Sequence, residues 1–238
     1  MAAACLVAAG ALAGCGDNQY RNPPYYAWDD LAAVGAFNID KMSPDSRAML
    51  HAVDSVRGSD DVVLFYGHDP PQMTHFDTID ALLTRAEQDG LATLTFADLA
   101  AGGSPRSGIC LSFDDTEVDA WYEMRDLLAR HHAHISLFVT EYARFTDEQR
   151  AKLHTLYVEG HSIEAHGIHH VHSLTYIAAH GVDALVTQEI QPSIDILRAD
   201  GFTPVAYAHP YGEHTRELDE ALAHRIRFAR ATSGRPKM

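Results

Sequence analysis

The chain has 238 residues, of which 46% are hydrophobic and 21% are charged, a composition ordinary for a globular protein that forms one large domain. Its 33 acidic and 18 basic residues give a formal net charge of -15, which argues against nucleic acid or an anionic lipid surface as the main partner. After residue 20 no stretch approaches the roughly 18 consecutive apolar residues of a transmembrane helix, so we expect none there.

The N-terminus has the composition of a targeting segment. Residues 1–15 are apolar, rich in alanine, and end in Leu12-Ala13-Gly14-Cys15. Small residues before a cysteine resemble the bacterial lipobox, in which that cysteine is lipidated and becomes the new N-terminus. No Lys or Arg precedes Cys15, which departs from the pattern, and an Ala-rich disordered tail is the alternative. We therefore predict a lipoprotein-type signal peptide over 1–15 and a lipid-anchored, exported protein of the bacterial cell envelope.

Residues 16–59 are predicted to form a tether and an N-terminal extension, since 18–24 is polar and contains two prolines. From 60 to 238 the sequence alternates between strand and helix patterns, which indicates a single domain. The predicted strands are 61–66, 92–96, 108–113, 135–140, 161–166, 204–209 and 227–231. The predicted helices are 118–131, 147–159, 182–199 and 216–224. Strands that alternate with helices favour a parallel α/β sheet closed, or nearly closed, into a barrel, with an open doubly wound sheet as the alternative.

Polar side chains follow four of these predicted strands. His68 follows the first strand, Asp114 and Asp115 the third, His166 the fifth, and His209 the sixth. In α/β barrels the carboxyl ends of the strands form the active face. The sequence therefore predicts one site built from these strand ends.

Neither the histidines nor the carboxylates identify that site alone. With 16 histidines in the chain, a pair at the spacing of His166 and His170 is expected by chance, and His161, His169 and His172 read equally well as solvated loop residues. An Asp-Asp pair also often begins a turn or caps a helix. Because neighbouring side chains on a strand face opposite ways, Asp114 and Asp115 are expected to have different roles.

Three motifs in order carry more information. They are Ser112-Phe113-Asp114-Asp115, then Gly160-His161-Ser162-Ile163-Glu164-Ala165-His166 with His170 four residues on, then Pro210-Tyr211-Gly212. This order resembles the NodB-type polysaccharide deacetylases of carbohydrate esterase family four, over about residues 61–232. The resemblance implies the α/β class, a distorted (β/α)7 barrel of parallel strands in a single domain. It also implies a metal-dependent hydrolase that removes acetyl groups from N-acetylated sugars of a polysaccharide or peptidoglycan.

The family's residue roles transfer to the matching positions. The resemblance makes Asp114 the general base and Asp115, His166 and His170 the ligands of one divalent metal ion. The backbone N–H of Tyr211 is expected to share in stabilising the oxyanion. Zinc is the default ion, with cobalt, nickel or iron as alternatives for two histidines and one carboxylate.

The sequence departs from the family at three places. Ala208 stands where the family often has an arginine that pairs with the base, which predicts an Asp114 without a cationic partner. Val171 replaces the usual proline after the second histidine ligand. The family's late Leu-x-His segment, which supplies the histidine that protonates the leaving amine, has no counterpart after residue 231. A substitute acid, a truncated chain or weak activity are the alternatives.

Several assignments stay open at this point. The candidates for a substitute acid are His68, His209 and His214. The rival functions are a catalytically inactive glycan-binding lipoprotein, an O-acetyl esterase and, less expected, a non-haem iron oxygenase. Cys110 lies in an apolar run and is predicted to be a buried packing thiol. The glycan, the acyl group and the oligomeric state are not indicated.

Overall fold

A computed structural model describes residues 23–233, so the predicted signal peptide and the anchor at Cys15 lie outside the described residues. Seven parallel strands form a closed ring. In ring order they are β2 (Ala33–Asn38), β3 (Val62–His68), β5 (Gly108–Asp115), β6 (Ser136–Val139), β7 (Ser162–Ala165), β8 (Ala206–Ala208) and β9 (Phe228–Thr232). The ring closes because β9 also pairs with β2. The predicted α/β barrel of parallel strands is confirmed.

One strand of the ring differs from the prediction, because β2 takes the place expected for the segment 92–96. The segment 92–96 forms only β4 (Ala92–Thr93), which pairs beside the start of β5 and outside the ring. It stops there because Thr95 caps α3 (Phe96–Ala101), with a capping box completed by Asp98. The missing barrel strand is β2, which lies within 16–59, so part of the predicted extension belongs to the barrel and the barrel begins before residue 60. A further short strand, β1 (Tyr25–Tyr26), pairs antiparallel with the start of β3.

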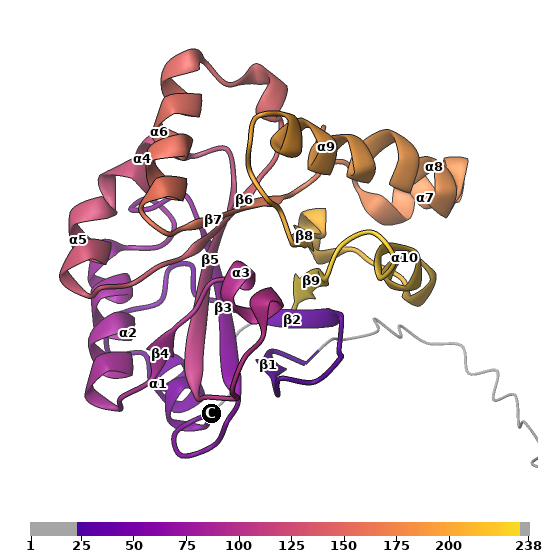
Figure 1. The fold of residues 1–238 in the computed structure, drawn as a ribbon. Helices are drawn as coiled ribbons and strands as arrows, with labels where there is room; N and C mark the ends of the chain where they lie inside the picture. Colours follow the sequence, from indigo (N-terminus) through magenta and orange to yellow (C-terminus); the bar gives the residue numbers. More distant parts are fainter. Residues whose placement is uncertain (1–22, 234–238) are drawn as a thin grey trace, which may run out of the picture.

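Ten α-helices connect the strands in the described part of the chain. They are α1 (Arg47–Asp54), α2 (Phe76–Gln88), α3 (Phe96–Ala101), α4 (Val118–Glu123), α5 (Arg125–Arg130), α6 (Asp147–Val158), α7 (Ser173–His180), α8 (Val182–Leu185), α9 (Gln191–Ala199) and α10 (Arg216–Leu222). A π-helical segment, Val186–Ile190, joins α8 to α9. Figure 1 shows α1, α2, α4, α5 and α6 along one side of the strands, with α7 to α9 and α10 on the other. Within residues 23–233 no helix has the length and apolarity to cross a bilayer.

The side chains of the ring alternate between two buried layers. In β3, Leu64 belongs to an inner cluster that fills the barrel, whereas Phe65 belongs to an outer cluster that packs against the helices. The inner cluster also contains Cys110, Phe138 and Phe228, so the interior is a packed core rather than a channel. Cys110 is fully buried, as predicted for a packing thiol. This alternation decides which residues at the strand ends turn towards the barrel mouth.

Candidate active site

Four strand ends place polar side chains at the mouth of the barrel. His68, Asp114 and Arg230 continue the inward-facing positions of β3, β5 and β9, and His166 follows β7 with the same phase. Asp114, His166 and Arg230 are nearly inaccessible to solvent. These residues lie far apart in the sequence, but parallel strands bring their carboxyl ends to one face of the barrel.

Asp115 breaks the alternation of β5. Its backbone has φ +89°, a left-handed conformation that costs a non-glycine residue on the order of 1–3 kcal/mol. Its carboxylate Oδ1 lies 3.5 Å from His166 Nε2 and 3.3 Å from His170 Nε2. His170 also has a positive φ of 53°. The strained backbone at these two positions accompanies the convergence of three potential ligand atoms.

The three atoms form a compact triangle, because the Nε2 atoms of His166 and His170 lie 3.1 Å apart. His166 Nδ1 lies 2.9 Å from the carbonyl oxygen of Ala208 and therefore carries the proton, which leaves Nε2 with its lone pair facing the triangle. Burial acts to raise the pKa of Asp115, but a hydrogen bond with His166 and the neighbouring histidines outweigh it and lower the pKa. Burial and the adjacent His166 lower the pKa of His170. Both shifts favour the deprotonated forms, which are the forms that bind metal. The donor set therefore suits one divalent ion.

The neighbouring histidines are directed elsewhere. His169 Nδ1 lies 2.9 Å from Glu189 and His172 Nδ1 lies 3.0 Å from Glu213. Neither forms part of the triangle of Asp115, His166 and His170.

Asp114 has a cationic partner, contrary to the prediction drawn from Ala208. Arg230 on β9 donates from Nη2 to Asp114 Oδ2, and both side chains are buried. The guanidinium also lies over the rings of Tyr66 and Phe138 at 4.8 and 4.9 Å. The second oxygen of Asp114, Oδ1, is buried without a hydrogen-bond partner among residues 23–233. A carboxylate with one unsatisfied oxygen can accept a proton or a hydrogen bond from a bound molecule.

Of the three candidate acids, only His68 faces Asp114. Its Nε2 lies 4.0 Å from Asp114 Oδ2, and its Nδ1 lies 2.6 Å from Asp40 Oδ2. Burial acts to lower the pKa of His68, but the hydrogen bond to Asp40 and the charge of Asp114 outweigh it and raise the pKa to about 9. Asp40 also accepts hydrogen bonds from the backbone N–H of His68 and from Thr74, at 2.9 and 2.7 Å. No motif in the sequence marks Asp40.

The other two candidates are held at Asp219. His209 Nε2 lies 3.1 Å from one carboxylate oxygen of Asp219, and His214 Nδ1 lies 2.9 Å from the other. His209 continues the outward-facing phase of β8, next to Tyr207 of the outer cluster. These contacts anchor both ends of the Pro210–Gly212 turn to α10.

Tyr211 lies at the edge of the candidate site. The residue is 54% exposed, and its ring stacks flat on that of His172 at 3.7 Å between centroids and lies 4.6 Å from the ring of His170. Its φ of 58° is another left-handed position. The Pro-Tyr-Gly turn is thus adjacent to the triangle.

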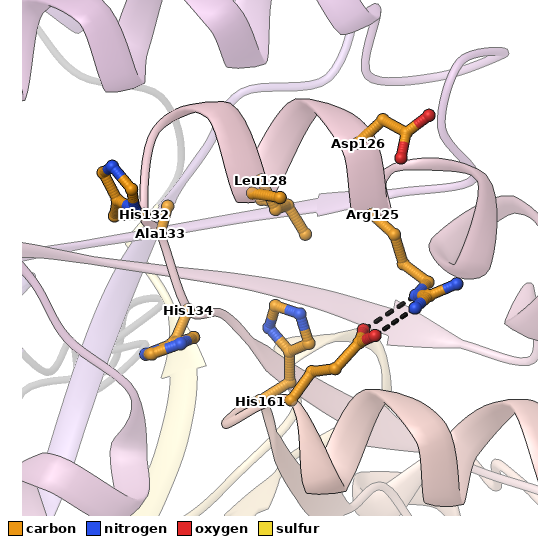
Figure 2. Close-up of a pocket in the computed structure, with 9 residues that line it drawn as sticks. Arg125, Asp126, Leu128, His132, Ala133, His134 and His161 are labelled. Atoms are coloured by element: carbon orange, nitrogen blue, oxygen red, sulfur yellow. Dashed lines mark hydrogen bonds and ion pairs between the residues drawn. The ribbon is translucent and has the colours of Figure 1, made fainter.

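A separate pocket of about 440 Å³ lies at the opposite end of the strands, before β6 and β7 (Figure 2). His161 and His134 line it, together with the ion pair of Arg125 and Glu159. His161 Nδ1 accepts from the backbone N–H of Ile135, and burial and the nearby His134 lower its pKa to about 4. His161 is therefore a neutral structural residue remote from the candidate site.

Comparisons with known proteins agree on a family and a fold. Residues 101–228 match the family model described as polysaccharide deacetylase. The solved structure of IcaB from Ammonifex degensii has a TM-score of 0.59 and 17% identity, over 74% of this chain and 86% of that one. The Streptococcus pyogenes deacetylase PplD, in complex with acetate, has a TM-score of 0.54 and 18% identity, over 68% and 78%. A polysaccharide deacetylase from Bacillus cereus has a TM-score of 0.56 and 16% identity, over 72% and 57%. At these identities the structures demonstrate a shared fold, and no curated protein matches in sequence.

Proposed function

Because the chain belongs to the polysaccharide deacetylase family, we propose that it hydrolyses the acetamide of N-acetylated sugars in a polysaccharide or peptidoglycan. Asp115, His166 and His170 would hold one divalent metal ion, with zinc as the default. The observation that supports this most directly is the triangle of three ligand atoms 3.1–3.5 Å apart, beside a buried carboxylate with an unsatisfied oxygen. When bound at such a site, a divalent ion polarises the acyl oxygen and lowers the pKa of water.

Asp114 is proposed as the general base. Its Oδ1 accepts the proton of the water that attacks the acetyl carbon, while Arg230 holds the other oxygen. The buried ion pair also fixes the orientation of the carboxylate. Pairing with Arg230 therefore substitutes for the arginine that is absent at Ala208.

His68 is proposed as the general acid. Asp40 binds its Nδ1–H, so Nε2–H is directed towards Asp114 and the reacting bond. A pKa of about 9 keeps this imidazole protonated at neutral pH. As the C–N bond breaks, His68 gives its proton to the departing nitrogen, and the products are acetate and the free amino sugar. The Tyr211 N–H is proposed to stabilise the acyl oxygen as it gains charge.

Two observations favour an enzyme over a glycan-binding protein without turnover. A buried Arg-Asp pair is costly to desolvate, and binding alone does not require it. A protonated His68 is also unnecessary for holding a neutral sugar. An O-acetyl ester is the alternative substrate, and acetylated xylan tests it.

The test is acetate release by the metal-reconstituted protein from chitooligosaccharides, peptidoglycan and acetylated xylan. We expect release from an N-acetylated glycan. Preferential release of acetate from acetylated xylan would instead indicate an O-acetyl esterase. Glycan binding without acetate release would indicate a binding protein.

Two neighbouring substitutions separate the proposed roles. Asp114→Asn should retain metal and lower turnover about 10²–10⁴-fold, because an amide cannot act as the base. Asp115→Asn should lose metal first, since it removes a charged ligand. Metal content per chain, measured beside activity, would reveal swapped roles if Asp114→Asn lost the ion and Asp115→Asn kept it.

A further inference from the structure

The two proposed histidine ligands are fixed in different ways. His166 is held through its ring, because Nδ1 donates to the carbonyl oxygen of Ala208. His170 has no such anchor, since no hydrogen bond holds its Nδ1 within the part of the chain that the structure describes. Its backbone also has the unfavourable φ of 53°. The position of the His170 ring therefore depends on how residues 167–169, which connect the two ligands, are held.

Glu189 holds two of these three connecting residues. Its backbone carbonyl accepts from the N–H of Ile168 at 3.1 Å, and its carboxylate Oε2 accepts from the N–H of His169 at 3.2 Å. Oε1 lies 2.9 Å from Nδ1 of the same histidine. The remaining residue, Gly167, is held through its carbonyl oxygen, which accepts from the hydroxyl of Thr140 at 2.9 Å. The whole connection between the two ligands is thus tied down, and most of its hydrogen bonds lead to Glu189.

Glu189 reaches this connection from an irregular helical turn. It lies in the π-helical segment Val186–Ile190, after which the N–H of Gln191 bonds to the carbonyl of Val186, five residues earlier. Pro192 comes next, and a proline has no N–H with which to continue the regular α-helical pattern. Turns of this kind are frequent at functional sites. The Glu189 side chain is only 9% exposed, and burying a carboxylate is costly unless hydrogen-bond donors surround it.

His169 is the side-chain partner of Glu189. Its side chain is 69% exposed, and its Nδ1 is directed to the carboxylate of Glu189 and away from the triangle of ligand atoms. It therefore contributes to the metal centre through its backbone N–H and its ring contact with Glu189.

We infer that Glu189 is a positioning residue that sets the affinity of the metal centre. By holding residues 168 and 169 it keeps His170 in its left-handed conformation before the ion arrives. Without Glu189 the connection can relax, and restoring it on binding costs free energy. This inference rests on the proposed function, because it takes Asp115, His166 and His170 as the ligands.

The experiment measures the affinity of the folded protein for Zn²⁺ by competition with a chelator at constant pH. Glu189→Gln keeps the size of the side chain, but an amide cannot accept from both the backbone N–H and the ring N–H of His169. We expect the affinity for Zn²⁺ to fall about 10–100-fold, the usual loss when a residue that supports metal ligands is replaced. Glu87→Gln is the control, because Glu87 on α2 also lies 2.9 Å from a histidine Nδ1, that of His131. It should bind Zn²⁺ as the wild type does.

Unfolding by urea without metal separates positioning from a purely structural role. Glu189→Gln also removes contacts of a buried side chain, so some loss of stability is expected. A lower free energy of unfolding with an unchanged affinity for Zn²⁺ would make Glu189 a structural residue only, and the inference would be wrong. Circular dichroism establishes that the affinity is measured on folded protein.

His169→Ala provides a second variant that should fold, since the side chain is exposed. It removes the ring contact and keeps the backbone N–H, so the affinity for Zn²⁺ should fall by less than in Glu189→Gln. Because both substitutions break the same contact, the double variant should lose less binding free energy than the sum of the two single losses. Full additivity, or an affinity equal to that of the wild type in His169→Ala, would contradict the inference.

Asp115→Asn, measured in parallel, distinguishes failure of the inference from failure of the proposed function. Loss of Zn²⁺ affinity in both Asp115→Asn and Glu189→Gln supports the inference. If Asp115→Asn loses the ion and Glu189→Gln keeps it, the inference alone is wrong. If Asp115→Asn binds Zn²⁺ as tightly as the wild type, the proposed metal centre is wrong and the inference fails with it.

Discussion

Arg230 on β9 and Asp114 on β5 form an ion pair across the barrel, although 116 residues separate them in the chain. Their side chains are 1% and 4% exposed. Asp114 is thus a buried carboxylate paired with an arginine from the last strand of the barrel. The same ion pair therefore connects two strands of the barrel and holds the proposed general base in position.

Replacing Arg230 by methionine should therefore affect both stability and activity. Removal of one partner of a buried pair typically costs about 3–5 kcal/mol, because the other charge stays buried without compensation. Loss of the guanidinium also removes the donor that orients the Asp114 carboxylate, so kcat/KM should fall as well. Urea unfolding and acetate release measure the two effects. Arg225→Met, at an exposed position, is the control and should change neither.

The assignment of His68 as the general acid predicts a change in the alkaline limb of the pH–rate profile, where kcat/KM falls as the acid loses its proton. His68→Gln should lower kcat/KM about 10²–10⁴-fold, with metal retained and the alkaline limb abolished. Asp40→Asn removes the partner that raises the pKa of His68 to about 9, so the alkaline limb should move to lower pH. His214→Gln should keep the limb, because His214 is directed to Asp219. A limb that vanished in His214→Gln and survived in His68→Gln would reassign the acid.

Glu164 should make the stability depend on pH. It is fully buried, with Oε2 accepting from the backbone N–H groups of Val205 and Ala206 at 2.7 Å, and burial raises its pKa to about 8. Because the pKa is raised in the folded state, the contribution of the neutral Glu164 to stability is complete below the usual glutamate pKa of 4.5 and is lost as pH rises through about 8. The free energy of unfolding should fall by at most about 1.4 kcal/mol per pH unit in that window.

Glu164→Gln should flatten this slope, because the amide is neutral at every pH. Urea unfolding from pH 5 to 9 measures the difference between variant and wild type. Glu220→Gln, at an exposed position, should preserve the slope of the wild type. Parallel curves for wild type and Glu164→Gln would contradict a titrating Glu164.

The lipid anchor is proposed from the sequence alone. Cys15→Ala should move the full-length protein from the membrane to the soluble fraction of the cell, because lipidation needs the thiol. Cys5→Ala, within the same segment, is the control and should stay with the membrane. Membrane association that persisted in Cys15→Ala would count against lipidation.

The barrel was predictable wherever a strand was an apolar run bounded by turns. β5, β6, β7 and β9 are such runs, and their predicted bounds lie within two residues of the observed ones. β2 was missed because AVGAFN consists largely of small residues and contains a glycine, so it lacks the run of large apolar side chains that marks a strand. The error at 92–96 has an identifiable cause, because Thr95 and Asp98 form a capping box that the apolar pattern concealed.

The site was predictable only as far as its motifs reach. Asp115, His166 and His170 lie near one another as their order in the chain suggested. Asp40 and Arg230 lie in no motif, because each pairs with a residue that is distant in the sequence, 28 and 116 positions away. A signal for Arg230 existed nonetheless, because a charged residue within the strand FARAT requires a buried partner.

The pairing of β9 with β2 has a consequence for how the protein is made. β2 is near the start of the described chain and β9 near its end, so the ring stays open during synthesis until residues 228–232 leave the ribosome. Until then Asp114 has no arginine beside it, and the inner faces of β2 and β8 lack their neighbour. Assembly of the proposed catalytic centre is thus one of the last folding events, and a nascent chain halted before β9 should remain unable to turn over substrate.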